Sequence, residues 1–193
     1  MADNNSNLVT AGKPKVGGAV FRAPIGTTLP TDAITALASG FQNVGYISED
    51  GVTNGNSKES EKIKDWGGVT VLTITKSKET TYKFTMIESM NKTALQTYYG
   101  DEAVTGTDLD SGLTVKNGAD DDTPHIYVVE QIAKGGVLHR TVIPSATVSE
   151  TEDIEYKGDN AVGLGVTLAC EADSDGYTNY EYLQKPPAQT PGE

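Results

Sequence analysis

Few residues of this 193-residue chain carry side chains suited to catalysis or metal binding. There are two histidines, His125 and His139, and one cysteine, Cys170. Both histidines lie in or beside strand-like segments, and a hairpin turning at residues 135–136 would place them near opposite ends of the pairing. That placement argues against a shared metal site or a catalytic base. Cys170 stands in Val-Thr-Leu-Ala-Cys-Glu, which is typical of a small buried hydrophobe, and a single cysteine excludes an intramolecular disulfide.

Sequence motifs that resemble known sites are incomplete. Asp-Ser-Asp-Gly at residues 173–176 lacks the spaced acids and the final glutamate of a calcium loop, so a turn is the better interpretation. Gly-Leu-Gly at 163–165 lacks the third glycine and the strand-to-helix setting of a dinucleotide site. The acidic run 120–122 indicates either a solvated loop or a surface facing another acidic polymer. We therefore expect no enzyme, no metal and no cofactor.

Trp66 is the single tryptophan, and it separates a polar stretch from Gly67 and Gly68. Two roles fit this position. The side chain either anchors the end of the polar stretch in the core or fills a pocket on a partner. The polar stretch, residues 53–62, contains no apolar side chain, so it is either a mobile loop or a strand with neither face in the core.

Composition indicates one domain with a core of ordinary size, because 36% of the residues are hydrophobic in a chain of 20.4 kDa. The net charge is −12, with Arg22 and Arg140 as the two arginines, which argues against tight DNA binding. The first residues predict no signal peptide, and no window has the apolar length of a membrane span.

The regular part of the pattern predicts antiparallel β-structure. Residues 69–75 are rich in β-branched side chains, and 81–87 alternate with Tyr82, Phe84 and Met86 on one face. We expect these segments to pair as a hairpin, with 76–80 as its loop or as the tips of two long strands. A second hairpin is predicted from 126–132 and 137–143 around Lys-Gly-Gly at 134–136, ended by Pro144.

Other elements complete the prediction. A helix is expected over 92–99, with Asn91 as its N-cap and Gly100 at its end, and one or two helical turns over 31–38. Strands are expected at 16–24, 146–154, 161–170 and 177–183. The fold class is therefore mainly β, an antiparallel β-sandwich or barrel with one flanking α-helix and a long extended hairpin and loop. Residues 1–15 are predicted as a flexible arm, 16–184 as the domain and 185–193 as a flexible tail.

Three stretches together resemble one protein family. They are Gly-Tyr-Ile-Ser-Glu-Asp-Gly at 45–51, Ile-Lys-Asp-Trp-Gly-Gly at 63–68, and Phe-Thr-Met-Ile-Glu at 84–88 followed by the helix ending Tyr-Tyr-Gly at 98–100. The chain resembles the major tail tube proteins of long non-contractile (siphovirus type) tailed bacteriophages, particularly those of Gram-positive hosts. The resemblance covers about residues 17–100 well.

The resemblance implies a β-sandwich subunit that forms hexameric rings stacked into a hollow tube. Hairpins of neighbouring subunits would join into an inner barrel, and a long loop with the terminal arms would contact the next ring. The candidate inter-ring loop residues are Glu49, Asp50, Asn54, Lys58, Glu59, Glu61, Lys62 and Trp66. The candidate inner-barrel hairpin residues are Val69, Val71, Thr73, Thr75, Glu79, Thr81, Lys83 and Thr85.

The same resemblance implies that the protein would be a virion structural protein assembled in the host cytoplasm. Its partners would be further copies of itself, the tape-measure protein, and the tail tip and tail terminator proteins. Six copies at −12 each carry −72 per ring, and an acidic lumen would let double-stranded DNA pass without adhering. Glu49, Asp50, Glu59, Glu61 and Glu79 are lumen candidates by position.

Alternative functions share the β-rich fold. A capsid decoration protein or a secretion-tube protein would also lack an active site, and a trimer would favour decoration. A monomeric carbohydrate-binding module would need an exposed aromatic platform, for which Tyr177, Tyr180 and Tyr182 are the clustered candidates.

Overall fold

The computed structural model describes residues 4–15, 17–118 and 122–186. In these residues antiparallel strands dominate and one α-helix flanks them, so the predicted fold class is confirmed. The helical elements are α1 (Lys92–Tyr99) and two short 3-10 turns, η1 (Ser6–Leu8) and η2 (Lys134–Gly136). The strands are β1 (Lys13–Pro14), β2 (Val20–Pro24), β3 (Gln42–Asn43), β4 (Ile47–Lys64), β5 (Thr70–Met86), β6 (Val104–Thr105), β7 (Thr114–Val115), β8 (His125–Ile132), β9 (Leu138–Thr151), β10 (Leu164–Cys170) and β11 (Tyr180–Gln184).

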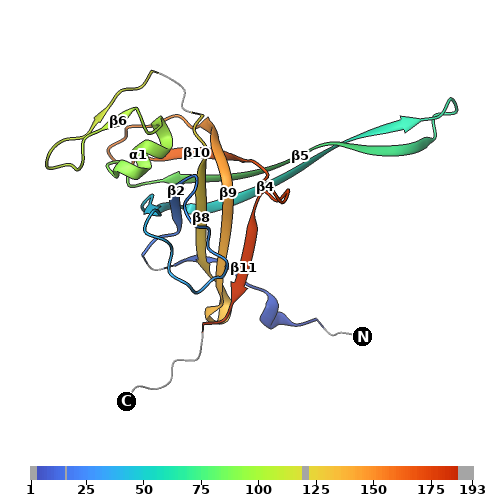
Figure 1. The fold of residues 1–193 in the computed structure, drawn as a ribbon, viewed down its shortest axis with the longest axis horizontal. Helices are drawn as coiled ribbons and strands as arrows, with labels where there is room; N and C mark the ends of the chain where they lie inside the picture. Colours follow the sequence, from blue (N-terminus) through green and yellow to red (C-terminus); the bar gives the residue numbers. More distant parts are fainter. Residues whose placement is uncertain (1–3, 16, 119–121, 187–193) are drawn as a thin grey trace, which may run out of the picture.

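One strongly coiled sheet forms the body, in the order β3-β2-β8-β9-β10-β5-β4, with β1 on β8 and β11 on β9. In Figure 1, β8 and β9 run across the direction of β5 and β10, so the sheet folds over on itself. Strand β9 connects the two parts, because its first half pairs with β8 and β11 and its second half pairs with β10. The small pair β6-β7 lies apart, near α1.

The predicted end of a strand at Pro144 is wrong, because β9 continues through this residue to Thr151. The pairing of β8 with β9 shifts between His125 and Tyr127, so β9 has one extra residue there. Proline has no backbone N–H to donate to a ladder, and a bulge is a place where that donor is not needed. The separate strand expected at 146–154 is the second half of β9.

The main core lies between the two parts of the coiled sheet and under α1. Its largest fully buried side chains include Tyr127, Met86, Ile143, Leu164 and Leu168. In β5 the predicted alternation is confirmed, since Tyr82, Phe84 and Met86 are all buried on one face. Helix α1 begins after Asn91, whose side chain accepts from the Thr93 amide, and ends at Gly100 as predicted.

A buried ion pair between Arg140 and Glu130 lies on the face of β8 and β9 that points away from the main core. Arg140 is 1% exposed and donates from Nε to Oε1 of Glu130 at 2.8 Å, while its Nη1 donates to the carbonyl oxygens of Asp32 and Thr35. The helical turns predicted over 31–38 are wrong, because the Asp32 carboxylate accepts from the amides of Ile34 and Thr35 and holds a bend instead. Arginine therefore attaches this bend to the sheet.

The N-terminal arm is partly paired with the body. Lys13 and Pro14 form β1 opposite Ile132 and Gln131, and the Lys15 ammonium lies 2.7 Å from Oε2 of Glu130. The boundaries of the predicted arm and domain stay predictions. Residues 187–193 of the predicted tail lie outside the described residues.

Candidate assembly surface

The hairpin of β4 and β5 is the feature that projects from the body (Figure 1). It differs from the predicted hairpin, because residues 69–75 and 81–87 do not pair with each other but belong to the single strand β5. Strand β5 pairs with the polar segment, so the strand alternative for residues 53–62 is confirmed and the loop alternative is wrong. The hairpin turn lies at Asp65–Val69, where Asp65 and Val69 bond through both backbone and side chain.

The hairpin changes character along its length. Its base is part of the core, and the Asn54 amide donates to the Tyr82 hydroxyl at 2.6 Å. Burial raises the pKa of the Tyr82 hydroxyl well above its ordinary value, and the nearby Glu181 carboxylate adds to this. Thr80 is the last buried residue of β5 on the way to the turn, and every residue from 57 to 79 is exposed. We call residues 57–79 the distal ribbon; the eight residues of its β4 half span roughly 25 Å.

Two bulges decide which side chains share a face of the distal ribbon. Glu59 pairs with Ser77 but Ser60 pairs with Thr75, so β5 has an extra residue at Lys76; a second extra residue lies at Val71. Directly paired residues point to the same side of a sheet. Three exposed apolar side chains therefore share one face, which we call the apolar face: Ile63, Leu72 and Ile74.

Trp66 lies in the turn at the tip, and its side chain is fully exposed at 105%. The core-anchor role considered for Trp66 is therefore wrong, and contact with a partner is the role that remains. An exposed tryptophan beside an exposed apolar face forms an apolar patch, and such patches mark sites of interaction with a partner.

Unpaired strand edges extend along the same hairpin. Strand β4 ends the sheet order, so its outer edge has no partner strand among the described residues. Strand β10 covers β5 only from Thr81 to Met86, which leaves β5 from Thr70 to Thr80 paired on one side alone. Long uncovered edges are templates for pairing with another chain, and a protein that stays monomeric has to protect them.

A family model described as phage tail tube protein matches residues 1–192. The chain belongs to the phage tail tube protein family. This membership confirms the resemblance to phage tail tube proteins, and it assigns the chain a structural role in the tail of the virion. The long non-contractile tail type and the host stay predictions. Copies of itself and other tail proteins are therefore its partners. No curated protein sequence matches the chain. No helix in the described part is long and apolar enough to cross a membrane.

The predicted site residues of this tail tube protein all lie along the β4-β5 hairpin. Glu49 and Asp50 lie at its base, and the other inter-ring candidates lie further along β4 and at the tip. The bulge at Lys76 puts the inner-barrel candidates on two different faces of the hairpin. Thr81, Lys83 and Thr85 lie on the face of the base that points away from the core. Thr73 and Thr75 lie on the distal ribbon, on the side opposite its apolar face. The roles of both sets stay predictions.

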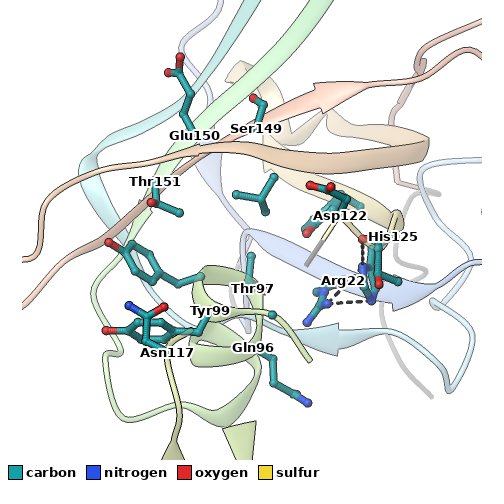
Figure 2. Close-up of a pocket in the computed structure, with 15 residues that line it drawn as sticks. Arg22, Gln96, Thr97, Tyr99, Asn117, Asp122, His125, Ser149, Glu150 and Thr151 are labelled. Carbon is teal, nitrogen blue, oxygen red and sulfur yellow. Dashed lines mark hydrogen bonds between the residues drawn. The ribbon is translucent and has the colours of Figure 1, made fainter. Parts of the chain in front are cut away.

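A pocket of about 450 Å³ lies beside α1, and Figure 2 shows its lining. At one end Nη2 of Arg22 lies 2.7 Å from Nε2 of His125 and 2.8 Å from Oδ1 of Asp101. Nδ1 of His125 lies 2.9 Å from the Thr123 carbonyl oxygen. These groups are bonded to one another, so the cluster joins β2, β8 and the segment after α1. Sequence reasoning missed Asp101, because 24 residues separate it from His125 and no motif connects the two.

The other residues considered for catalysis or metal binding make contacts within the fold. His139 lies 3.2 Å from Glu181 between β9 and β11, away from His125. Burial raises the pKa of the Cys170 thiol to about 12, which leaves it protonated at neutral pH. The turn predicted at 173–176 is confirmed, since the Asp173 carboxylate accepts from the amides of Asp175 and Tyr177. In the acidic run, residues 120 and 121 lie outside the described residues.

Proposed function

We propose that this chain forms hexameric rings that stack into the hollow tube of a long non-contractile tail of siphovirus type, in a phage of a Gram-positive host, and that double-stranded DNA passes through the tube during ejection. The observation that carries the proposal is the β4-β5 hairpin: along the distal ribbon its outer edges, and its apolar face, have no partner among the described residues. Pairing between subunits would cover these edges, and a closed ring leaves none exposed.

The inner-barrel role and the inter-ring role belong to different parts of the hairpin's length, and not one to each strand. Because β4 and β5 pair along their length, neither strand can line the lumen alone while the other contacts the next ring. The base of the hairpin extends the sheet of the body and is the proposed inner-barrel wall. The distal ribbon, with Trp66 at its tip, reaches beyond the body and is the proposed inter-ring contact.

The face of β4, β5, β10 and β9 that points away from the core fits the surface of a lumen. Register places small polar side chains and one carboxylate across it: Thr53, Thr81, Thr85, Thr147, Thr167 and Glu150. A second carboxylate, Glu152, follows β9, and its amide donates to the Gly165 carbonyl oxygen. The one lysine of this face, Lys83, lies 2.6 Å from Glu152, and this bond raises the pKa of the ammonium group. A threonine-rich, net acidic face has little to hold phosphates, which suits DNA passage. Tape-measure, tail tip and terminator proteins are proposed as its further partners.

A ribbon-trimmed variant tests the assembly role. Asn56 and Thr80 are paired, so residues 57–79 can be replaced by Asn-Gly, which makes a two-residue hairpin turn. The wild-type chain, concentrated and viewed by negative-stain electron microscopy, should form hollow tubes of uniform width. The trimmed chain should remain a folded monomer by circular dichroism and sedimentation. Normal tubes from the trimmed chain would show that the distal ribbon is not an assembly contact.

Reversing the charge of the proposed lumen tests DNA passage. Tubes of Glu150→Lys with Glu152→Lys should retain a short DNA duplex on pelleting at low salt, whereas wild-type tubes should release it. The matched control is the double variant Glu155→Lys with Asp159→Lys, which makes the same change of charge further along the segment between β9 and β10, where Glu155 bonds Lys157 and not a residue of the lumen face. Equal DNA retention by the two double variants would contradict the assignment of the lumen face.

A further inference from the structure

Charge is unevenly distributed between the distal ribbon and the rest of the chain. The ribbon holds five lysines and four carboxylates, a net charge of +1. The whole chain has a net charge of −12, so the residues outside the ribbon carry −13. One third of the 15 basic residues of the chain therefore lie on the long hairpin that projects away from an acidic body.

Within the distal ribbon, the charges are also separated by face. Register and the two bulges place Lys58, Lys62, Lys64 and Lys78 on the side opposite the apolar face. The other residues of this side are Ser60, Thr70, Thr73 and Thr75, so it carries no carboxylate. We call the four lysines the lysine face. The acids Glu59, Glu61 and Glu79 lie on the apolar side. Lys76, the extra residue of the bulge, reaches the same side, where it bonds Glu61.

The lysine face lacks compensating charge within the part of the chain that the structure describes. Lys58 and Lys78 are directly opposite each other, and like charges at such positions destabilise a sheet. None of the four lysines makes an ion pair with another described residue, although all four are exposed. Lys76, on the other side, has its nitrogen 3.0 Å from Oε2 of Glu61. The arrangement suits a surface whose anions come from another molecule.

We propose that the lysine face docks against the acidic body of a second copy of this chain, so that assembly of the tube depends on an electrostatic contact made by this side of the ribbon. The inference rests on the proposed function and names the partner of the distal ribbon. Each copy contains both of the complementary surfaces, because its ribbon has a net charge of +1 and its body a net charge of −13. DNA is the other polyanion in a tail, but six lysine faces lining a lumen would hold phosphates and oppose the passage of the genome.

Two lysines of one strand provide matched variants. Lys78→Glu alters the lysine face, and Lys76→Glu makes the same change of charge two positions away on the opposite side. Loss of the exposed Lys76–Glu61 pair should affect the fold little. The critical concentration for assembly of the full chain is measured by pelleting and electron microscopy at about 50 and about 500 mM NaCl. Lys78→Arg keeps the charge and serves as the conservative variant.

Lys78→Glu should raise the critical concentration about tenfold at low salt, and Lys76→Glu about twofold or less. Added salt should weaken wild-type assembly and reduce the difference between the variants, and Lys78→Arg should behave as wild type. Equal effects of the two glutamate variants would overturn the inference while tubes continued to support the proposed function. Normal assembly of Lys78→Glu, with loss of duplex binding by its tubes, would overturn it in favour of DNA. Absence of any wild-type assembly would instead refute the proposed function itself.

Discussion

The apolar face of the distal ribbon should control assembly without contributing to the stability of the subunit. Leu72 is 51% exposed and Ile74 is 45% exposed, so about half of each side chain remains to be buried by a partner. Complete burial of a leucine or isoleucine contributes about 1.5–3 kcal/mol, so the remaining half of each is worth about 1 kcal/mol. Replacing both by threonine should therefore weaken one subunit contact by about 2 kcal/mol, which corresponds to an increase of roughly 30-fold in critical concentration.

The test uses a double variant that carries both Leu72→Thr and Ile74→Thr. Its control is a second double variant, Thr73→Ser and Thr75→Ser, on the other side of the same strand. Both double variants should unfold in urea within about 0.5 kcal/mol of wild type, because all four side chains are exposed in the single chain. Only the first should fail to form tubes at the wild-type critical concentration. Normal assembly of the first variant would refute the reasoning that this face is covered in the tube. A large loss of stability would instead show that the face is already buried within one chain.

Three further predictions concern the body of the subunit. Glu130→Ala should lower the free energy of unfolding by about 3–5 kcal/mol in urea titrations, because it leaves the buried Arg140 without its carboxylate; a loss below about 1 kcal/mol would contradict this. Asn91→Ala removes the cap of α1 and should cost about 1 kcal/mol, measured in the same way, whereas Asn91→Ser should retain most of the stability. The Tyr180 hydroxyl donates to Asp173, which lowers the pKa of the carboxyl and raises that of Tyr180 to about 12. This bond should stabilise the fold above about pH 4, fade as pH falls through the lowered pKa, and also fade as pH rises from about 10 towards 12; Tyr180→Phe should flatten the urea midpoint against pH at both ends, and an unchanged profile would contradict the assignment.

Local patterns predicted the elements whose signals lie close together in the chain. Asn91 and Gly100 predicted both ends of α1, because a cap acts through backbone groups within one turn. Alternation in residues 81–87 predicted the buried face of β5, since one side of that strand contacts the core.

The pairing of β4 with β5 could not be predicted from the sequence pattern, for a physical reason. A strand with neither face in the core shows no alternation, so nothing in residues 53–62 distinguishes a strand from a loop. The sequence pattern therefore predicts that residues 69–75 pair with the next regular segment, whereas the two segments belong to one strand. The two bulges in β5 are equally invisible, because an extra residue changes the ladder and not the composition.

Sequence by itself determined the class of fold, the acidic charge, the absence of a recognisable catalytic motif and the resemblance to tail tube proteins. These properties depend on composition and on short patterns. Only the tertiary structure decided that Trp66 is at an exposed tip, that the hairpin edges are open, and that apolar side chains and lysines occupy opposite faces of the distal ribbon. Those features depend on the register between two strands, and register is set by contacts between residues far apart in the chain.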